Sequence, residues 1–198
     1  MKKRIWVTSL VVGLLAAATL GLLSLYPRPP AVARETVERA VFTSPDRLRA
    51  AEALPVARAL LGELSYQENG TSCGPASLAN VFRSFGQTQR TESSVLKGTG
   101  RCPFGICSGG LSLDDLAEVA KAHTQHPVTV LRDLTPEAFL EEMKKVNDPS
   151  RRYIINFHRK PIFGTGGGHH SPIGAYLEKE DLVLVVDVNE NYGPWLIE

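Results

Sequence analysis

One cysteine stands in a stretch that suits a reactive thiol. Cys73 follows Thr71-Ser72, precedes Gly74-Pro75, and runs into apolar residues at helical spacing from Leu78 to Phe85. A helix is therefore expected to begin at the cysteine. A thiol there lies near the positive end of the helix dipole, which lowers its pKa and favours the thiolate. The stretch indicates a nucleophile, against the alternative of a small buried hydrophobe.

A cysteine nucleophile needs a histidine base, which a third polar side chain orients. His169 and His170 stand where a glycine run enters a predicted strand, and Asp187 ends the next one. Because neighbouring residues of a strand face opposite sides, only one of the two histidines can point at the thiol. The remaining histidines, His123, His126 and His158, are predicted to be surface residues.

Predicted helices come first along the chain and predicted strands come second. The helices are expected at 51–64, at 73–85, after a Ser112 cap and from Thr135-Pro136, and the strands at 128–131, 153–157, 172–177 and 182–188. This order predicts an α+β fold with helices gathered on one side of a sheet, because alternating βα units are absent.

The N-terminus reads as an export or anchoring signal. Basic residues at 2–4 precede an uncharged, mostly apolar run over residues 5–26, and about 20 residues suffice to cross a bilayer. Two outcomes stay open: a retained inner-membrane anchor, or cleavage after Ala33. In both, the domain is exported to a periplasmic or other extracytoplasmic space. The predicted division is a signal or anchor at 1–33, a linker at 34–50, and a catalytic domain at 51–198.

The composition limits the classes of ligand and the cysteine chemistry that we expect. The formal net charge is +1, from 22 Lys and Arg against 21 Asp and Glu, and such a balance argues against nucleic-acid binding. The three cysteines cannot all pair within the chain. Cys102 and Cys107 bracket a short loop of an exported domain, which favours a disulfide over a metal clamp.

Several motifs together resemble the phytochelatin synthase family over about residues 65–188. They are Gln67 six residues before Cys73, the helix start Cys73-Gly-Pro-Ala-Ser, Gly110-Leu-Ser-Leu-Asp-Asp-Leu, Tyr153-Ile-Ile-Asn-Phe-His-Arg, Gly168-His-His-Ser-Pro-Ile-Gly-Ala-Tyr and Asp187-Val. The block around His169 is the most specific of them.

The resemblance implies a papain-like fold and acyl transfer on glutathione. The resemblance implies that Cys73 is the nucleophile, that His169 is the general acid and base, and that Asp187 orients His169. It also implies that Gln67 donates a hydrogen bond to the oxyanion. The acyl group would pass to water or to a second glutathione. No resident cofactor or metal is expected, since cadmium or zinc would enter as the metal thiolate of glutathione. The sequence leaves a homodimer open.

The chain departs from the family pattern after Asp187. The family carries a basic segment with Tyr-Pro-Pro, whereas here Asn189-Glu-Asn-Tyr-Gly-Pro-Trp follows, with acidic Glu190 in place of an arginine. This favours hydrolysis over chain extension. Two alternatives remain: a C39-like peptidase of peptide leaders, because Gln67 and the Cys73 motif also resemble that group, and a non-catalytic binder of thiol ligands.

Overall fold

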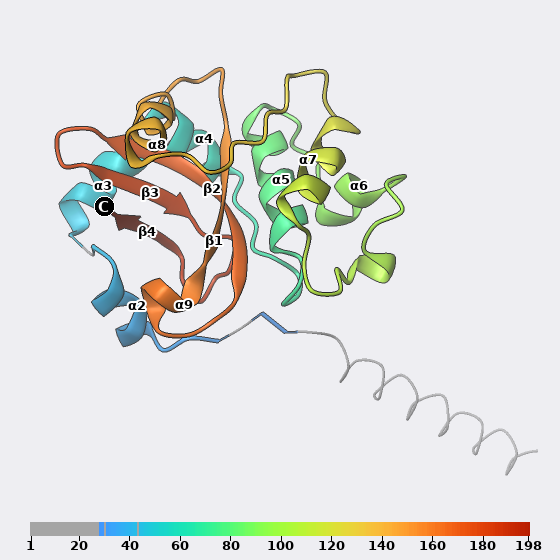
Figure 1. The fold of residues 1–198 in the computed structure, drawn as a ribbon, viewed down its shortest axis with the longest axis horizontal. Helices are drawn as coiled ribbons and strands as arrows, with labels where there is room; N and C mark the ends of the chain where they lie inside the picture. Colours follow the sequence, from blue (N-terminus) through green and yellow to red (C-terminus); the bar gives the residue numbers. More distant parts are fainter. Residues whose placement is uncertain (1–27, 30, 43) are drawn as a thin grey trace, which may run out of the picture.

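The computed structural model describes residues 28–29, 31–42 and 44–198, so the predicted anchor at 5–26 lies outside the described residues. Figure 1 shows a sheet with flanking helices on the left and a group of helices on the right. The predicted α+β class is confirmed, and the mixture of helices with an antiparallel sheet agrees with a papain-like fold.

The sheet has four antiparallel strands in the order β1-β2-β3-β4. Their bounds are Tyr153–His158 for β1, Gly168–Leu177 for β2, Leu182–Val186 for β3 and Pro194–Ile197 for β4. The first three agree with the strands expected from β-branched and aromatic residues, whereas β4 was not predicted. β4 pairs Trp195 with Val185 of β3, and so brings an indole next to the end of that strand.

Helices cover both faces of the sheet, not one side as the sequence predicted. One face packs with Val37 of α2 (Arg34–Ala40), Met143 of α8 (Pro136–Met143) and Phe163 of α9 (Arg159–Phe163). The other packs with α3 (Pro45–Glu52), α4 (Pro55–Gly62) and α5 (Cys73–Ser84). All residues of β3 are buried, because a sheet covered on both faces has no wet side.

The helix α5 is the central helix that the sequence predicted. Eleven of its twelve residues are buried, and it begins at Cys73 after the N-cap Ser72. On its outer side it contacts α6 (Glu92–Leu96) and α7 (Leu113–Lys121), which lie to its right in Figure 1. Ser112 caps α7 and Thr135 caps α8, as their sequences predicted.

The predicted linker at 34–50 is wrong, because α2 and most of α3 occupy it. In α2 the residue Val37 is only 7% exposed and belongs to the core on one face of the sheet. Phe42 then forms an isolated bridge with Leu196 of β4. The charged residues that indicated a tether line the outer side of short helices, whose few apolar positions face the domain.

Two further expectations differ from the structure. The predicted helix at 51–64 is divided between α3 and α4, because Pro55 starts a new helix at its first position. Residues 128–131 form no strand. Val128 packs instead against the core between α5, α6 and α7, which explains an apolar β-branched residue there without strand pairing.

We expect Gly174→Ala to destabilise the domain. A Cβ at Gly174 would lie 2.8 Å from Val186 Cγ2 and 3.4 Å from the backbone Cα of Ala57, so α4 and β3 would have to move. Such overpacking costs about 1 to 3 kcal/mol of unfolding free energy, which urea titration measures. Gly62→Ala is the matched control, because nothing lies within 4 Å of its Cβ. Equal stability of the two variants would refute the close packing.

Candidate active site

The cysteine lies at the first position of α5, and the structure brings it to the start of β2. Cys73 is 7% exposed and contacts Ala76 and Val188. Its side chain is hydrogen-bonded to His169, which lies almost a hundred residues later in the chain. Cys73 is also the free cysteine, because Cys102 and Cys107 form a disulfide. That predicted disulfide is confirmed.

The imidazole of His169 lies between the thiol and a carboxylate. Its Nε2 is 3.0 Å from Asp187 Oδ1, which leaves Nδ1 as the nitrogen that faces Cys73. The ring is buried, and Phe157, the residue paired with His169 across β1 and β2, packs its edge against it at 5.6 Å between centroids. This packing holds the ring in one orientation.

The neighbouring histidine points elsewhere. His170 Nε2 lies 2.9 Å from the backbone oxygen of Leu111, and Ser77 of α5 donates to the His170 carbonyl at 3.0 Å. The alternation of a strand therefore separates the two imidazoles, as expected. Of the histidines predicted to be at the surface, His126 and His158 are exposed, whereas His123 is half-buried beside Arg90.

The carboxylate of Asp187 is fully buried and accepts from several groups besides His169. Arg159 Nη2 donates to its two oxygens at 2.7 and 2.8 Å, and the indole of Trp195 donates to Oδ2 at 3.2 Å. The backbone N–H of Asn189 adds a bond of 2.8 Å. A buried carboxylate needs this many donors to stay ionised. Neither Arg159 nor Trp195 was predicted from the sequence as a site residue.

Arg159 is itself almost fully buried at the start of α9. Its side chain is 4% exposed, and its guanidinium carbon lies 3.8 Å from the centre of the Tyr192 ring. The aromatic face and the carboxylate of Asp187 together compensate for the lost hydration of the cation. The signal that could have found it is the arginine directly after β1 in the motif Tyr153-Ile-Ile-Asn-Phe-His-Arg.

The environment shifts Cys73 towards the thiolate and His169 towards the imidazolium. Burial acts to raise the pKa of Cys73, but the hydrogen bond and charge of His169 outweigh it, with a smaller effect of Arg159, and the pKa lies below its ordinary value. Burial likewise acts to lower the pKa of His169, but Asp187 and Cys73 outweigh it, and the net shift is upward. Each group is among the causes of the other's pKa shift, so the two titrations are coupled.

Gln67 lies in the segment that leads to Cys73. Its backbone N–H donates to the Val188 carbonyl at 2.7 Å, which ties this segment to the residue after Asp187. Its side-chain Nε2 donates to the Asn69 carbonyl at 2.6 Å. A primary amide has two N–H donors, so one remains for another acceptor. We call residues 67–73 the nucleophile loop.

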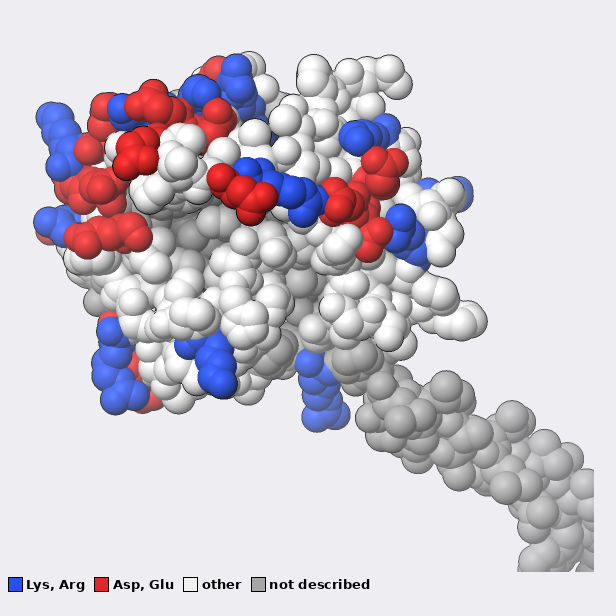
Figure 2. Space-filling model, viewed as in Figure 1, with Lys and Arg blue, Asp and Glu red and all other residues white. Residues whose placement is uncertain are grey.

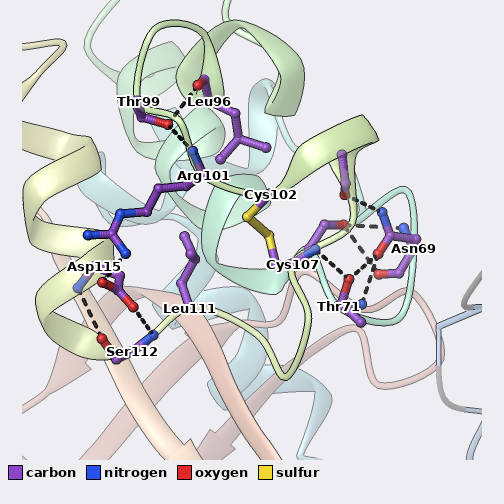
Figure 3. The surroundings of a disulfide bond; sticks show 12 residues. Asn69, Thr71, Leu96, Thr99, Arg101, Cys102, Cys107, Leu111, Ser112 and Asp115 are labelled. Atoms are coloured by element: carbon purple, nitrogen blue, oxygen red, sulfur yellow. Dashed lines mark hydrogen bonds and ion pairs between the residues drawn. A yellow bond between two sulfur atoms is a disulfide. The ribbon is translucent and has the colours of Figure 1, made fainter.

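The loop that the disulfide closes, residues 102–107, packs against the nucleophile loop (Figure 3). The Cys107 N–H donates to Thr71 Oγ1 at 3.1 Å, and Asn69 Nδ2 donates to the Gly105 carbonyl at 3.0 Å. On its far side this region is held by an ion pair between Arg101 and Asp115. The Cys102–Cys107 bond thus supports the segment before the thiol from outside.

On the face in Figure 2, Lys and Arg side chains lie interspersed with Asp and Glu, mostly over the upper half. Within the described ranges, no three His, Cys, Asp or Glu side chains are placed to hold a metal ion. Across the same ranges, no helix has the length and apolar character needed to cross a bilayer.

Short stretches of the chain are similar to two plant proteins. A stretch of 44 residues is 47% identical to glutathione gamma-glutamylcysteinyltransferase 3 of Lotus japonicus, and covers 22% of this chain and 9% of that protein. A stretch of 35 residues is 49% identical to glutathione gamma-glutamylcysteinyltransferase 1 of Triticum aestivum, over 18% of this chain and 7% of that protein. These alignments span less than a tenth of each plant protein. The family model of phytochelatin synthase matches residues 36–198, and the chain belongs to this family.

Proposed function

We propose that the protein is an enzyme that cleaves the Cys-Gly bond of glutathione through a γ-glutamylcysteinyl thioester on Cys73. The observation that carries this proposal is the hydrogen-bonded chain from Cys73 through His169 to Asp187 in a member of the phytochelatin synthase family. The names of the two plant relatives support glutathione as the substrate.

The first half-reaction forms the thioester. The Cys73 thiolate attacks the carbonyl carbon of the Cys-Gly bond, and the oxyanion accepts the free N–H of Gln67 and the Cys73 backbone N–H. The C–N bond then breaks as the His169 imidazolium gives its proton to the leaving glycine amine. Asp187, held by Arg159 and Trp195, keeps Nδ1 of His169 towards the thiol.

The second half-reaction releases the acyl group. His169 takes a proton from water, and the resulting hydroxide attacks the thioester carbon. The C–S bond then breaks, which releases γ-glutamylcysteine and returns Cys73 to the thiolate. The amine of a second glutathione can replace water and give a longer product. Water is the preferred acceptor in this proposal, because Glu190 is exposed two residues after the sequence Asp187-Val188 and cannot pair with a glutathione carboxylate as an arginine would.

The cellular setting is also part of the proposal. The N-terminal signal would place the domain in the periplasm or another extracytoplasmic space, with an inner-membrane anchor if residues 5–26 are retained. Cadmium or zinc would reach the site only as the thiolate of glutathione, the substrate. A homodimer is not required by the site, because Cys73, His169, Asp187 and Gln67 all come from one chain.

Incubation of the purified protein with glutathione tests the function. We expect free glycine in equal amount to γ-glutamylcysteine, and an adduct of one γ-glutamylcysteinyl group on Cys73 by mass spectrometry. Cys73→Ser controls for contaminating peptidases. Longer γ-glutamylcysteinyl products in the presence of cadmium would show that transfer exceeds hydrolysis. Cleavage of a double-glycine leader without glycine release would favour the C39-like alternative, and ligand binding without an adduct would favour a binder.

A further inference from the structure

We propose that Glu92 is a positioning residue that fixes both ends of the nucleophile loop and thereby sets the geometry between Gln67 and Cys73. This inference rests on the proposed roles of those two residues. Glu92 lies on α6, outside the motifs that resemble the family and nineteen positions after Cys73. Its hydrogen bonds to the loop go to Glu68 and Ser72, which are not among the proposed reacting groups.

The contacts of Glu92 fall on the two residues that adjoin Gln67 and Cys73. Its Oε1 accepts from the Glu68 backbone N–H at 2.8 Å, directly after Gln67. The same carboxyl group is hydrogen-bonded to the side chain of Ser72, directly before Cys73. One buried side chain therefore bridges the residue that follows Gln67 and the residue that precedes Cys73.

The bridge continues into the middle of the loop. Ser72 is fully buried, and its hydroxyl accepts from the Asn69 backbone N–H at 3.2 Å. The single hydroxyl proton is shared between the Asn69 carbonyl, also at 3.2 Å, and the Glu92 carboxyl group. Glu92 is 7% exposed, so solvent cannot readily replace its oxygens if they are removed. Loss of the carboxyl group would leave the Glu68 N–H without its acceptor and loosen the turn that presents the Gln67 amide.

The surroundings make the charge of Glu92 sensitive to pH. Burial raises the pKa of Glu92 to about 7, against the hydrogen bonds from Ser72 and the Glu68 N–H, which lower it. The Glu68 carboxylate adds a further upward shift and Arg83 of α5 a downward one. Above this pH the group is a carboxylate, which is the stronger acceptor for both partners. Below it, a proton occupies one oxygen.

Kinetics of glycine release test the inference with three variants. Glu92→Ala removes both acceptors, and we expect kcat to fall about 10-fold to 100-fold with a smaller change in KM, as for misplacement of a catalytic group. Glu92→Gln keeps an acceptor for Glu68 but has no charge to titrate. It should recover much of the activity. The change in kcat near pH 7 that the titration of Glu92 causes in the wild type should be absent. Glu63→Gln is the matched control, because Glu63 is exposed and also interacts with Arg83.

Amide hydrogen exchange separates this inference from the proposed function. The Glu68 amide should exchange faster in Glu92→Ala than in the wild type and in Glu63→Gln, whether or not glutathione is the substrate. Faster exchange in a protein that releases no glycine would support the positioning role and reject the function. An unchanged exchange rate of the Glu68 amide in Glu92→Ala would overturn the inference. So would a change in kcat near pH 7 in Glu92→Gln that equals the change in the wild type. If Glu92→Ala does not fold, the Glu92→Gln exchange and profile decide it.

Discussion

Replacement of His169 by alanine is expected to lower kcat for glycine release from glutathione by about 10³-fold or more. The imidazole is proposed to serve twice, as the acid for the leaving glycine and as the base for the attacking water. Alanine removes both proton transfers and the side-chain hydrogen bond between Cys73 and His169. Steady-state kinetics on the wild type and the variant measure the loss.

The pH dependence of thiol alkylation checks the same residue without glutathione. In the wild type the hydrogen bond and charge of His169 hold the pKa of Cys73 below its ordinary value, so iodoacetamide should react at a pH where ordinary thiols are protonated. In His169→Ala the burial of the thiol is no longer offset by the imidazole, so the rise of the alkylation rate with pH should move to higher pH.

His158→Ala is the matched control for both measurements. His158 ends β1 and is exposed, and its imidazole accepts only from the backbone N–H of Lys160 at 3.3 Å. Its loss should leave kcat and the alkylation profile close to the wild type. An alkylation profile of His169→Ala that matches the wild type would contradict the thiolate–imidazolium pair.

Replacement of Arg159 by methionine is expected to destabilise the domain by about 3 to 5 kcal/mol and to reduce activity with it. Methionine has a similar length but no charge, so Asp187 would remain buried without its two bonds from the guanidinium. The penalty is that of an unpaired carboxylate in a place that water does not reach. Urea unfolding at neutral pH measures the free energy of unfolding.

The pH dependence of stability should change in a defined direction. Burial acts to raise the pKa of Asp187, but its bonds and charge interactions with His169 and Arg159 outweigh it, and the pKa lies below its ordinary value. The wild type therefore has this stabilisation above about pH 4, the unfolded value, and loses it as the pH falls through the folded pKa. Without Arg159 the folded pKa rises, so acid unfolding should begin at a higher pH.

A double variant distinguishes stability from catalysis. Arg159→Met combined with Asp187→Asn removes both charges, so the unfolding free energy should recover relative to either single variant. Activity should not recover, because an amide stabilises an imidazolium less than a carboxylate does. Additive losses of stability in the double variant would show that the two side chains do not form the buried pair.

Local sequence features predicted the helices best. Ser112 and Thr135 are polar caps before apolar residues at helical spacing, and both helices begin where their caps stand. These signals lie within one turn of the chain, so no distant residue is needed to interpret them. The linker over 34–50 was predicted wrongly for the opposite reason. Whether Val37 is buried depends on a surface formed by residues more than a hundred positions later.

The sequence by itself determined that a thiol would begin a buried helix, and that a histidine and an aspartate would stand at neighbouring strand ends. Strand alternation alone left the choice between His169 and His170 open, and the family resemblance implied His169, which the structure places at Cys73. Only the tertiary structure decided that Arg159, Trp195 and Glu92 support the site. The physical reason is that caps, periodicity and strand alternation depend on adjacent residues. Burial of a charge depends on partners that folding brings from distant parts of the chain, and no local pattern records them.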